Sequence, residues 1–454
     1  MTVAPERMLT RRTIATYAIG SLGTGGFATL PGLVLVFYLT DTLGIAALAA
    51  GILVTVAKVW DVLIDPVIGA RSDLSLARRG SRRPFMLIGA IALPVFFALT
   101  FAVPAGLGPV VSGVWVLLAF LITATAFSLF QVPYIALPAE IVSSYDDRTK
   151  LISARVVVLT IAILLFGAGG PEIRTAFADE YVGYLVMAIV AGLVIGIGML
   201  IASFSAPRGV AAEAPAFSIL DNYRLGFAAL KRSQPFRSLL FAFLLQGLAT
   251  GLMLAGAQYV ANWVLGTGVT ILFLALIAPA LLFAPVWAII SKRIGKERSF
   301  VCASLLFGIA AASLTLLVWF PGEWLYLPVA LAGAGYAGMQ SLPMSMLPDV
   351  ISHDAASHGT GNAGTFGGVW TAGETTGMAL GATVLTVVLA ASGYLESVGG
   401  QVVAQPPSAI AGIILSFSVV PAVIIAASLF AFARYPLRKS DIDTRGIGTA
   451  KVDA

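Results

Sequence analysis

The stretch KVWDVLIDPVIGA, residues 58–70, places Lys58, Asp61 and Asp65 inside an apolar run that extends over residues 45–70. Ionisable side chains are costly inside a bilayer, and those that occur there usually serve a function. Spacings of three and four residues put all three side chains on one face of a helix. The run therefore predicts a membrane-spanning helix with a functional charged face.

The whole chain has the same apolar character. Of its 454 residues, 59% are hydrophobic and 11% are charged, whereas about a quarter of the residues in a soluble domain are charged. This composition argues against soluble enzymes, disordered proteins and nucleic-acid binders. One cysteine and two histidines make a zinc cluster implausible. The sequence contains no ATPase phosphate-binding loop and no hydrolase motif. We expect a polytopic membrane protein that is not an enzyme and uses no cofactor.

Apolar runs long enough to cross a bilayer, about 20 residues each, recur along the chain. We predict twelve spans in an all-α protein. They are 13–39, 45–70, 84–105, 110–139, 152–170, 182–204, 237–262, 268–290, 299–319, 324–347, 363–392 and 409–433.

Positive charge predicts the orientation of these spans. Arginine and lysine gather before span 1, after span 12 and in the loops that follow even-numbered spans, whereas the opposite loops hold one base, Arg174. Basic loops stay in the cytoplasm. Both termini are therefore predicted to be cytoplasmic, in a multi-pass protein of a bacterial inner membrane. The net charge of +5 follows from orientation and needs no anionic partner.

The two halves of the chain resemble each other. Pro66-Val67 after span 2 matches Pro285-Val286 after span 8, and the Pro-x-x-x-Leu-Pro pattern of residues 133–138 after span 4 matches residues 343–348 after span 10. Both matches keep the same in/out sense. Two parallel six-span repeats are typical of major facilitator transporters. We predict six-helix bundles over 1–206 and 237–435, a cytoplasmic linker over 207–236 and a cytoplasmic tail over 436–454.

The acids of span 2 are the strongest candidates for a site. Two carboxylates one helical turn apart repel each other, so one is protonated or both share a cation. Lys58 can offset one of the two charges, and the other then requires Na⁺, Li⁺ or H⁺. A static salt-bridge network between helices is the alternative. The second half has Ala284 where the first has Asp65, which favours a specialised site over a requirement of the fold.

Span 11 holds a further embedded acid, Glu374, among several glycines. Small residues let membrane helices approach closely. The acid is either functional or held by neighbouring hydroxyls such as those of Thr371 and Thr375.

Three segments carry a family resemblance. They are residues 58–84, the run VPYIALPAE at 132–140 followed by Arg155, and the run SMLPDVI at 345–351 followed by Trp370. Together they resemble the signatures of the glycoside–pentoside–hexuronide:cation symporter family, a melibiose-carrier-like branch of the major facilitators. The resemblance implies a cation site at Asp61 and Asp65, with Ser128 as its hydroxyl and Lys58 as a basic residue on the same helix. Na⁺ or H⁺ would be the only ion held there.

The chain departs from that family at several positions. Ile64 replaces an asparagine that helps to hold sodium, which favours H⁺ over Na⁺. Gly25 and Gln131 replace two sugar-binding aspartates, and Ile135 replaces a stacking tryptophan, so a melibiose-type galactoside pocket is not preserved. The remaining candidate contacts for the solute are Gln131, Tyr134, Arg155, Gln340, Trp370 and Glu374.

Charged residues at the cytoplasmic ends of the spans are candidate gates, namely Asp73, Arg82, Arg83 and Asp349. In the predicted cycle, a cation neutralises the acids of span 2. A solute then binds between the halves near the midplane, and the halves rock.

We predict a monomeric cation-coupled symporter of a small sugar or glycoside-like solute. Its partners are that solute and the bilayer, and it binds no nucleic acid. A lysolipid or amphiphile transporter on the same scaffold is the first alternative, because the sugar-binding acids are lost. A non-transporting sensor or channel is the second.

Overall fold

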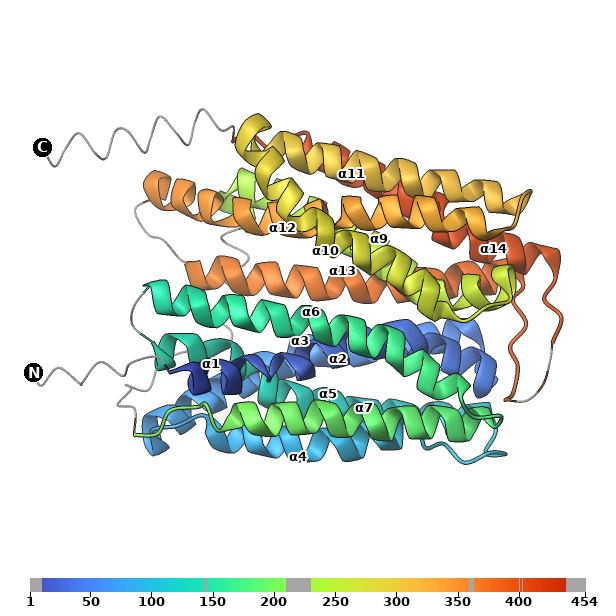
Figure 1. Ribbon diagram of the computed structural model, residues 1–454, viewed down its shortest axis with the longest axis horizontal. Helices are drawn as coiled ribbons and strands as arrows, with labels where there is room; N and C mark the ends of the chain where they lie inside the picture. Colours follow the sequence, from blue (N-terminus) through green and yellow to red (C-terminus); the bar gives the residue numbers. More distant parts are fainter. Residues whose placement is uncertain are drawn as a thin grey trace, which may run out of the picture. The chain divides into compact units, whose positions relative to one another are not determined.

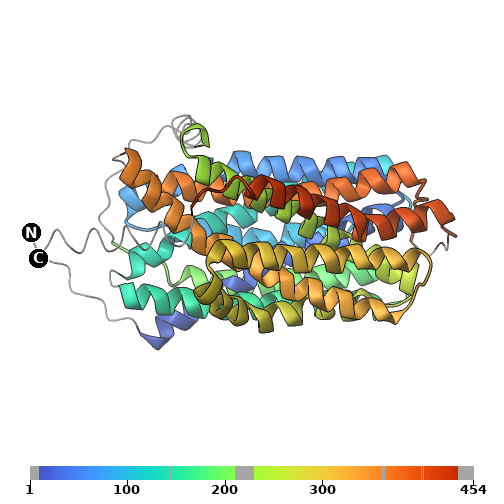
Figure 2. The ribbon, with the colours of Figure 1, turned by 90° about the horizontal axis from the view of Figure 1, so that it is seen from above.

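The computed structural model describes residues 10–142, 145–209, 230–358, 363–399, 401 and 403–437. Long helices make up most of this part of the chain (Figures 1 and 2). Helices suit a bilayer because each backbone N–H and C=O finds its partner within the same segment.

The chain forms two compact units. Unit 1 is Met1–Ile219 with Leu395–Ala404, and unit 2 is Leu220–Tyr394 with Gln405–Ala454. The predicted linker 207–236 lies mostly outside the described residues, as does the predicted tail from residue 438 onward.

The helices of unit 1 begin with a short segment that is broken from the next at Ile19 and Gly20. They are α1 (Arg11–Ala18), α2 (Ser21–Phe37), a π-helical turn η1 (Tyr38–Thr42), α3 (Ala47–Arg79), α4 (Arg83–Thr100), α5 (Pro109–Ile141), α6 (Tyr145–Thr175) and α7 (Glu180–Ser203).

Unit 2 repeats this series of helices. They are α9 (Gln234–Tyr259), a π-helical turn η2 (Val260–Leu265), α10 (Val269–Ile294), α11 (Lys296–Ser313) with the 3₁₀ turn η3 (Leu314–Val318), the 3₁₀ turn η4 (Glu323–Leu325), α12 (Tyr326–His358), α13 (Ala363–Ser392), α14 (Pro407–Phe417) and α15 (Val419–Phe432). The last span is interrupted at Ser418 because Pro421 has no N–H to donate to the carbonyl of Phe417.

Helix pairing confirms the internal repeat. In unit 1, α4 packs on α5 and α7, α2 on α6, and α3 on α5; in unit 2, α11 packs on α12 and α15, α9 on α13, and α10 on α12. Each helix pair in unit 1 therefore has a counterpart in unit 2 that is formed by the spans at the same positions in the repeat. The π-helical turns also correspond, because η1 ends the first span of unit 1 and η2 ends the first span of unit 2.

The described residues contain eleven helical segments that are long and apolar enough to span a membrane. The predicted span 324–347 is present as α12 but is not among them, because glycines, prolines, Tyr336 and Gln340 lower its apolar content. The prolines placed after spans 2, 4, 8 and 10 lie inside α3, α5, α10 and α12. That placement was wrong because prolines are tolerated within membrane helices, where neighbours satisfy the freed backbone groups.

Glycine allows a close contact between α13 and α9 in unit 2. A Cβ atom on Gly381 of α13 would lie 2.3 Å from the backbone N of Leu252 on α9 and 2.6 Å from the carbonyl O of Leu248. The α9 backbone cannot move without disturbing its own helix, so only glycine fits there.

Gly381→Ala should therefore lower the free energy of unfolding by about 1–3 kcal/mol, the usual cost of overpacking. The measurement is thermal unfolding of the purified protein in detergent. Gly368→Ala on the same helix is the matched control, because nothing lies within 4 Å of a Cβ atom built there. Equal unfolding midpoints for the two variants would contradict the prediction.

Candidate functional site

The charged face predicted on span 2 is present on α3. The Lys58 ammonium lies 3.2 Å from Oδ2 of Asp61, and both side chains are partly buried. A spacing of three residues brings the two groups together on one face of the helix. Lys58 thus forms an ion pair with Asp61 and offsets the negative charge of its carboxylate.

Asp65 lies one turn further along α3 and, among the described residues, has no ion-pair partner like that of Asp61. Its Oδ1 atom is buried without a hydrogen-bond partner. The Ser128 hydroxyl of α5, which is 3% exposed, interacts with the carboxylate, and the charges of Asp61 and Lys58 act on it as well. The structure therefore brings together all four residues predicted for the cation site.

A second polar cluster joins the first span of unit 1 to α5 and α6. The Tyr134 hydroxyl donates to the carbonyl O of Tyr17 (2.9 Å) and lies 3.1 Å from Oγ of Ser21. The Arg155 guanidinium sits over the Tyr134 ring, 5.2 Å from its centre, and the Arg155 Nε is buried without a hydrogen-bond partner. Tyr134 is fully buried in this structure and its ring supports Arg155.

Gln131 precedes this cluster on α5. Its side-chain oxygen accepts a hydrogen bond of 2.8 Å from the Thr24 hydroxyl of α2. The amide nitrogen of the same side chain remains as a donor. Gln131 and Arg155 therefore keep the properties expected of solute contacts.

Glu374 of α13 faces polar groups of α12. Gln340 interacts with the Glu374 carboxylate, and its Nε2 donates to the Tyr336 hydroxyl at 3.2 Å. The neighbouring threonines do not cap the acid with the bonds they make, because Thr371 donates to the carbonyl of Gly367 and Thr375 donates to the carbonyl of Thr371. Of the two interpretations of Glu374, the structure disfavours the hydroxyl cap.

Trp370 does not present its ring to a solute. Its side chain is 2% exposed, stacks on Phe243 of α9 at 4.4 Å between ring centres, and donates its indole N–H to the sulfur of Met344. In this structure the ring packs between α9 and α13, as suits a buried aromatic side chain, and a solute contact at Trp370 stays a prediction.

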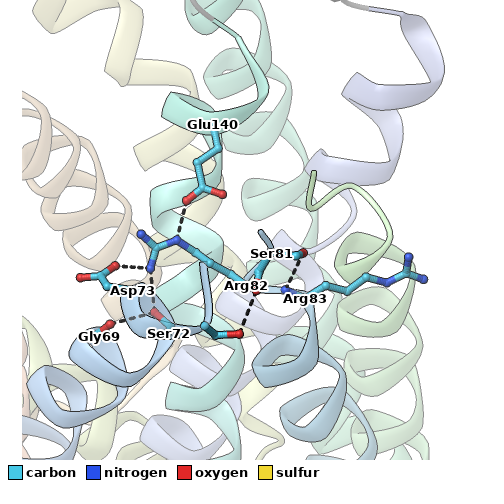
Figure 3. Close-up of polar contacts among 8 residues, drawn as sticks. Gly69, Ser72, Asp73, Ser81, Arg82, Arg83 and Glu140 are labelled. Carbon is cyan, nitrogen blue, oxygen red and sulfur yellow. Dashed lines mark hydrogen bonds and ion pairs between the residues drawn. The ribbon is translucent and has the colours of Figure 1, made fainter. Parts of the chain in front are cut away.

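An arginine-centred network of ion pairs and hydrogen bonds lies at the C-terminal end of α3 (Figure 3). The Arg82 guanidinium pairs with both Asp73 and Glu140, and its Nη1 donates to Oγ of Ser72 at 2.7 Å. Glu140 belongs to α5, so one side chain connects α3, α4 and α5. Arg83 points away from this network, and its guanidinium lies 3.9 Å from the centre of the Phe204 ring.

Unit 2 has a corresponding ion pair. Lys296 of α11 pairs with Asp349 of α12 at 2.5 Å and donates to the carbonyl of Ser345. Arg82–Glu140 and Lys296–Asp349 thus join equivalent helices in the two units. The sequence indicated Asp349, but Glu140 and Lys296 were missed. Both partners lie more than fifty residues from the group they neutralise, and no local spacing connects them.

Solved structures share this architecture. The crystal structure of a D-xylose–proton symporter matches with a TM-score of 0.66 at 13% sequence identity, over 94% of this chain and 98% of that one. At that identity the likeness establishes the fold alone, which is the fold of a major facilitator.

Sequence comparisons define the family. The glucuronide carrier protein homolog of Escherichia coli (strain K12) is 26% identical over 442 residues, which cover 95% of this chain and 94% of that protein. The isoprimeverose transporter of Lactiplantibacillus pentosus is 24% identical, with 93% and 88% covered. The MFS/sugar transport protein family matches residues 16–439, so the chain belongs to that family. The resemblance to glycoside–pentoside–hexuronide:cation symporters is confirmed, and the protein is a membrane carrier and not an enzyme.

The Arg82 network makes a specific prediction about stability. Arg82→Ala leaves Asp73 and Glu140 without their shared cation, and breaking a buried ion pair costs about 3–5 kcal/mol. The double variant Arg82→Ala/Glu140→Gln should recover part of this loss, because the more buried of the two uncompensated charges is gone. Thermal unfolding of both variants and of Glu140→Gln alone completes the cycle. Additive losses would show that the two side chains do not interact.

Proposed function

We propose that the protein carries a sugar or glycoside-like solute across the membrane together with a cation, and that Asp65 is the residue that binds the cation. The observation that supports this most directly is the buried Oδ1 atom of Asp65, which has no hydrogen-bond partner. A buried carboxylate in this state is stabilised by a proton or by a metal cation.

The coupling ion is H⁺ in this proposal. Lys58 already offsets Asp61, so one proton on Asp65 balances the remaining charge of the cluster. A proton needs a single oxygen atom, whereas hard metal cations take about six oxygen ligands. Ile64 contributes no side-chain oxygen between the two acids. Na⁺ coupling is the alternative, and it predicts that added Na⁺, not acid, strengthens solute binding.

Neutralisation of Asp65 supplies the coupling energy. A cation can shift an equilibrium between two conformations only by its difference in affinity for them. A difference of about 1–3 kcal/mol is typical of coupled sites. We infer that solute binding is favoured in the conformation in which Asp65 is neutral.

The solute class follows from the relatives and from the polar groups that stay available. The two relatives compared above are named for a glucuronide and for isoprimeverose. Gln131 and Arg155 in unit 1, and Gln340 and Glu374 in unit 2, offer hydrogen-bond donors and acceptors that suit sugar hydroxyls. We assign these four residues as solute contacts, with Tyr134 as the support of Arg155.

The basic loops orient the carrier with both termini in the cytoplasm of a bacterial cell and with the Arg82 network on the same side. We infer that this network, together with Lys296–Asp349 in unit 2, stabilises the state that is closed to the cytoplasm.

Asp65→Asn tests the coupling role, because it keeps the shape of the side chain and removes the titratable charge. We expect gradient-driven accumulation of solute in proteoliposomes to fall by about tenfold or more, while exchange of labelled for unlabelled solute continues. Glu323→Gln, at an exposed acid of η4, is the control and should accumulate solute normally. Loss of both accumulation and exchange would contradict a coupling role for Asp65.

Linked binding provides a test that needs no gradient. Thermal unfolding in detergent is measured with glycosides, pentosides, hexuronates and lysolipids, at two pH values and with or without Na⁺. A sugar-class ligand at a hundred times its Kd should add about 2.7 kcal/mol to the stability, with tighter binding at the lower pH. Stronger binding with Na⁺ and not with acid would make Na⁺ the coupling ion. Stabilisation by lysolipids alone would overturn the sugar assignment.

A further inference from the structure

A short segment between α13 and α14 packs with unit 1, although both of those helices belong to unit 2. We call residues Leu395–Gly399 the strap. The strap pairs with η1 and the residues after it through an antiparallel bridge between Val398 and Leu43. It lies at the end of α3 that is opposite to the Arg82 network.

Backbone hydrogen bonds fix the register of the strap. The N–H of Ser397 donates to the carbonyl of Thr40 (3.1 Å), and the N–H of Gly399 donates to the carbonyl of Thr42 (2.9 Å). The Ser397 hydroxyl donates to the carbonyl of Asp41 at 2.8 Å. These bonds occupy carbonyls at the end of a π-helical turn, where the regular helical pattern stops.

The strap also completes the beginning of α3. The residue before the first turn, Ala46, has no side chain that can cap the helix. The Glu396 carboxylate supplies the cap, because its Oε1 accepts a hydrogen bond of 2.7 Å from the N–H of Ala47. A carboxylate at this position satisfies a free N–H and meets the positive end of the helix dipole.

We propose that the strap is a releasable clamp on the helix that binds the cation, and that Glu396 is a positioning residue for Asp61 and Asp65; this rests on the function proposed above. The strap continues directly into α13 and α14. Any movement of the adjoining ends of those helices away from α3 either releases the strap or pulls on α3. Solute contacts on α13, such as Glu374, are linked in this way to the cation site on α3.

The contacts of the strap suit reversible docking. Its large apolar side chains, Leu395 and Val398, are 46% and 39% exposed while the strap is docked. Both side chains thus remain in partial contact with solvent, and hydrogen bonds carry much of the attachment. Segments with few buried apolar contacts open most readily.

A disulfide between Leu43→Cys and Val398→Cys tests the need for release. Residues paired across an antiparallel bridge have Cα atoms about 4.5–5.5 Å apart, which suits a disulfide. The native Cys302 is replaced by serine to keep the pairing unambiguous. We expect the oxidised protein in proteoliposomes to transport at least about tenfold more slowly than the reduced protein, with full recovery after reduction. Equal rates at complete cross-linking would overturn the proposal.

Substitution of Glu396 tests the cap separately. Glu396→Ala should increase hydrogen exchange at the first-turn amides of α3, residues 47–50, and should raise the half-saturating cation concentration about threefold. Glu396→Gln keeps an oxygen acceptor and should restore most of both properties. Glu323→Ala, an acid outside the strap, is the control and should change neither. Unchanged exchange in Glu396→Ala would refute the cap, and changed exchange with an unchanged cation requirement would refute the positioning role.

The two proposals fail in different ways. Hydrogen exchange at α3 requires no solute, so it reports on the strap even if the transported molecule is not a sugar. If the reduced cysteine variant and the wild-type protein both transport no sugar while Glu396→Ala still loosens α3, the sugar assignment fails and the strap stands.

Discussion

Water is scarce in the hydrocarbon layer of a bilayer, and every charge placed there needs a partner within the protein. This constraint decides where the ionisable residues of the chain lie. Arg82 and Lys296 are each neutralised across helices at the ends of spans, and Lys58 is neutralised within its own helix. Asp65 differs from these groups because, within the described residues, its carboxylate forms no ion pair while its Oδ1 atom is buried without a hydrogen bond. The proposed transport cycle begins with the cation that supplies this missing partner.

The internal repeat is easier to recognise in helix contacts than in sequence. The π-helical turns η1 and η2, and the pairs Arg82–Glu140 and Lys296–Asp349, occupy equivalent places in the two units. The units differ where chemistry is concentrated, since Asp65 on α3 is matched by Ala284 on α10. The shared features stabilise the helical scaffold, and the unshared ones include the residues proposed to bind the cation and the solute.

Local sequence patterns predicted the spans, the repeat and the cation cluster, because each depends on apolar length or on a spacing of three or four residues. They could not predict Glu140 as a partner of Arg82 or Glu396 as the cap of α3, since these contacts join residues far apart in the chain. The packing of Trp370 could not be predicted for a related reason. Its residue type suits sugar stacking, but only the packing of α9 on α13 shows that its ring is already covered by Phe243.

The origin of the α3 cap also bears on biosynthesis. Chains fold from the N-terminus as they emerge from the ribosome, and α3 is made 349 residues before the carboxylate that caps it. The spans of the first half therefore enter the membrane before α3 has its cap, which is supplied only after α13. An N-terminal half expressed alone would lack the strap entirely, and its acids would sit on a helix with a frayed beginning. The cap of α3 is thus supplied only after the eleventh span has been made, long after the first half is complete.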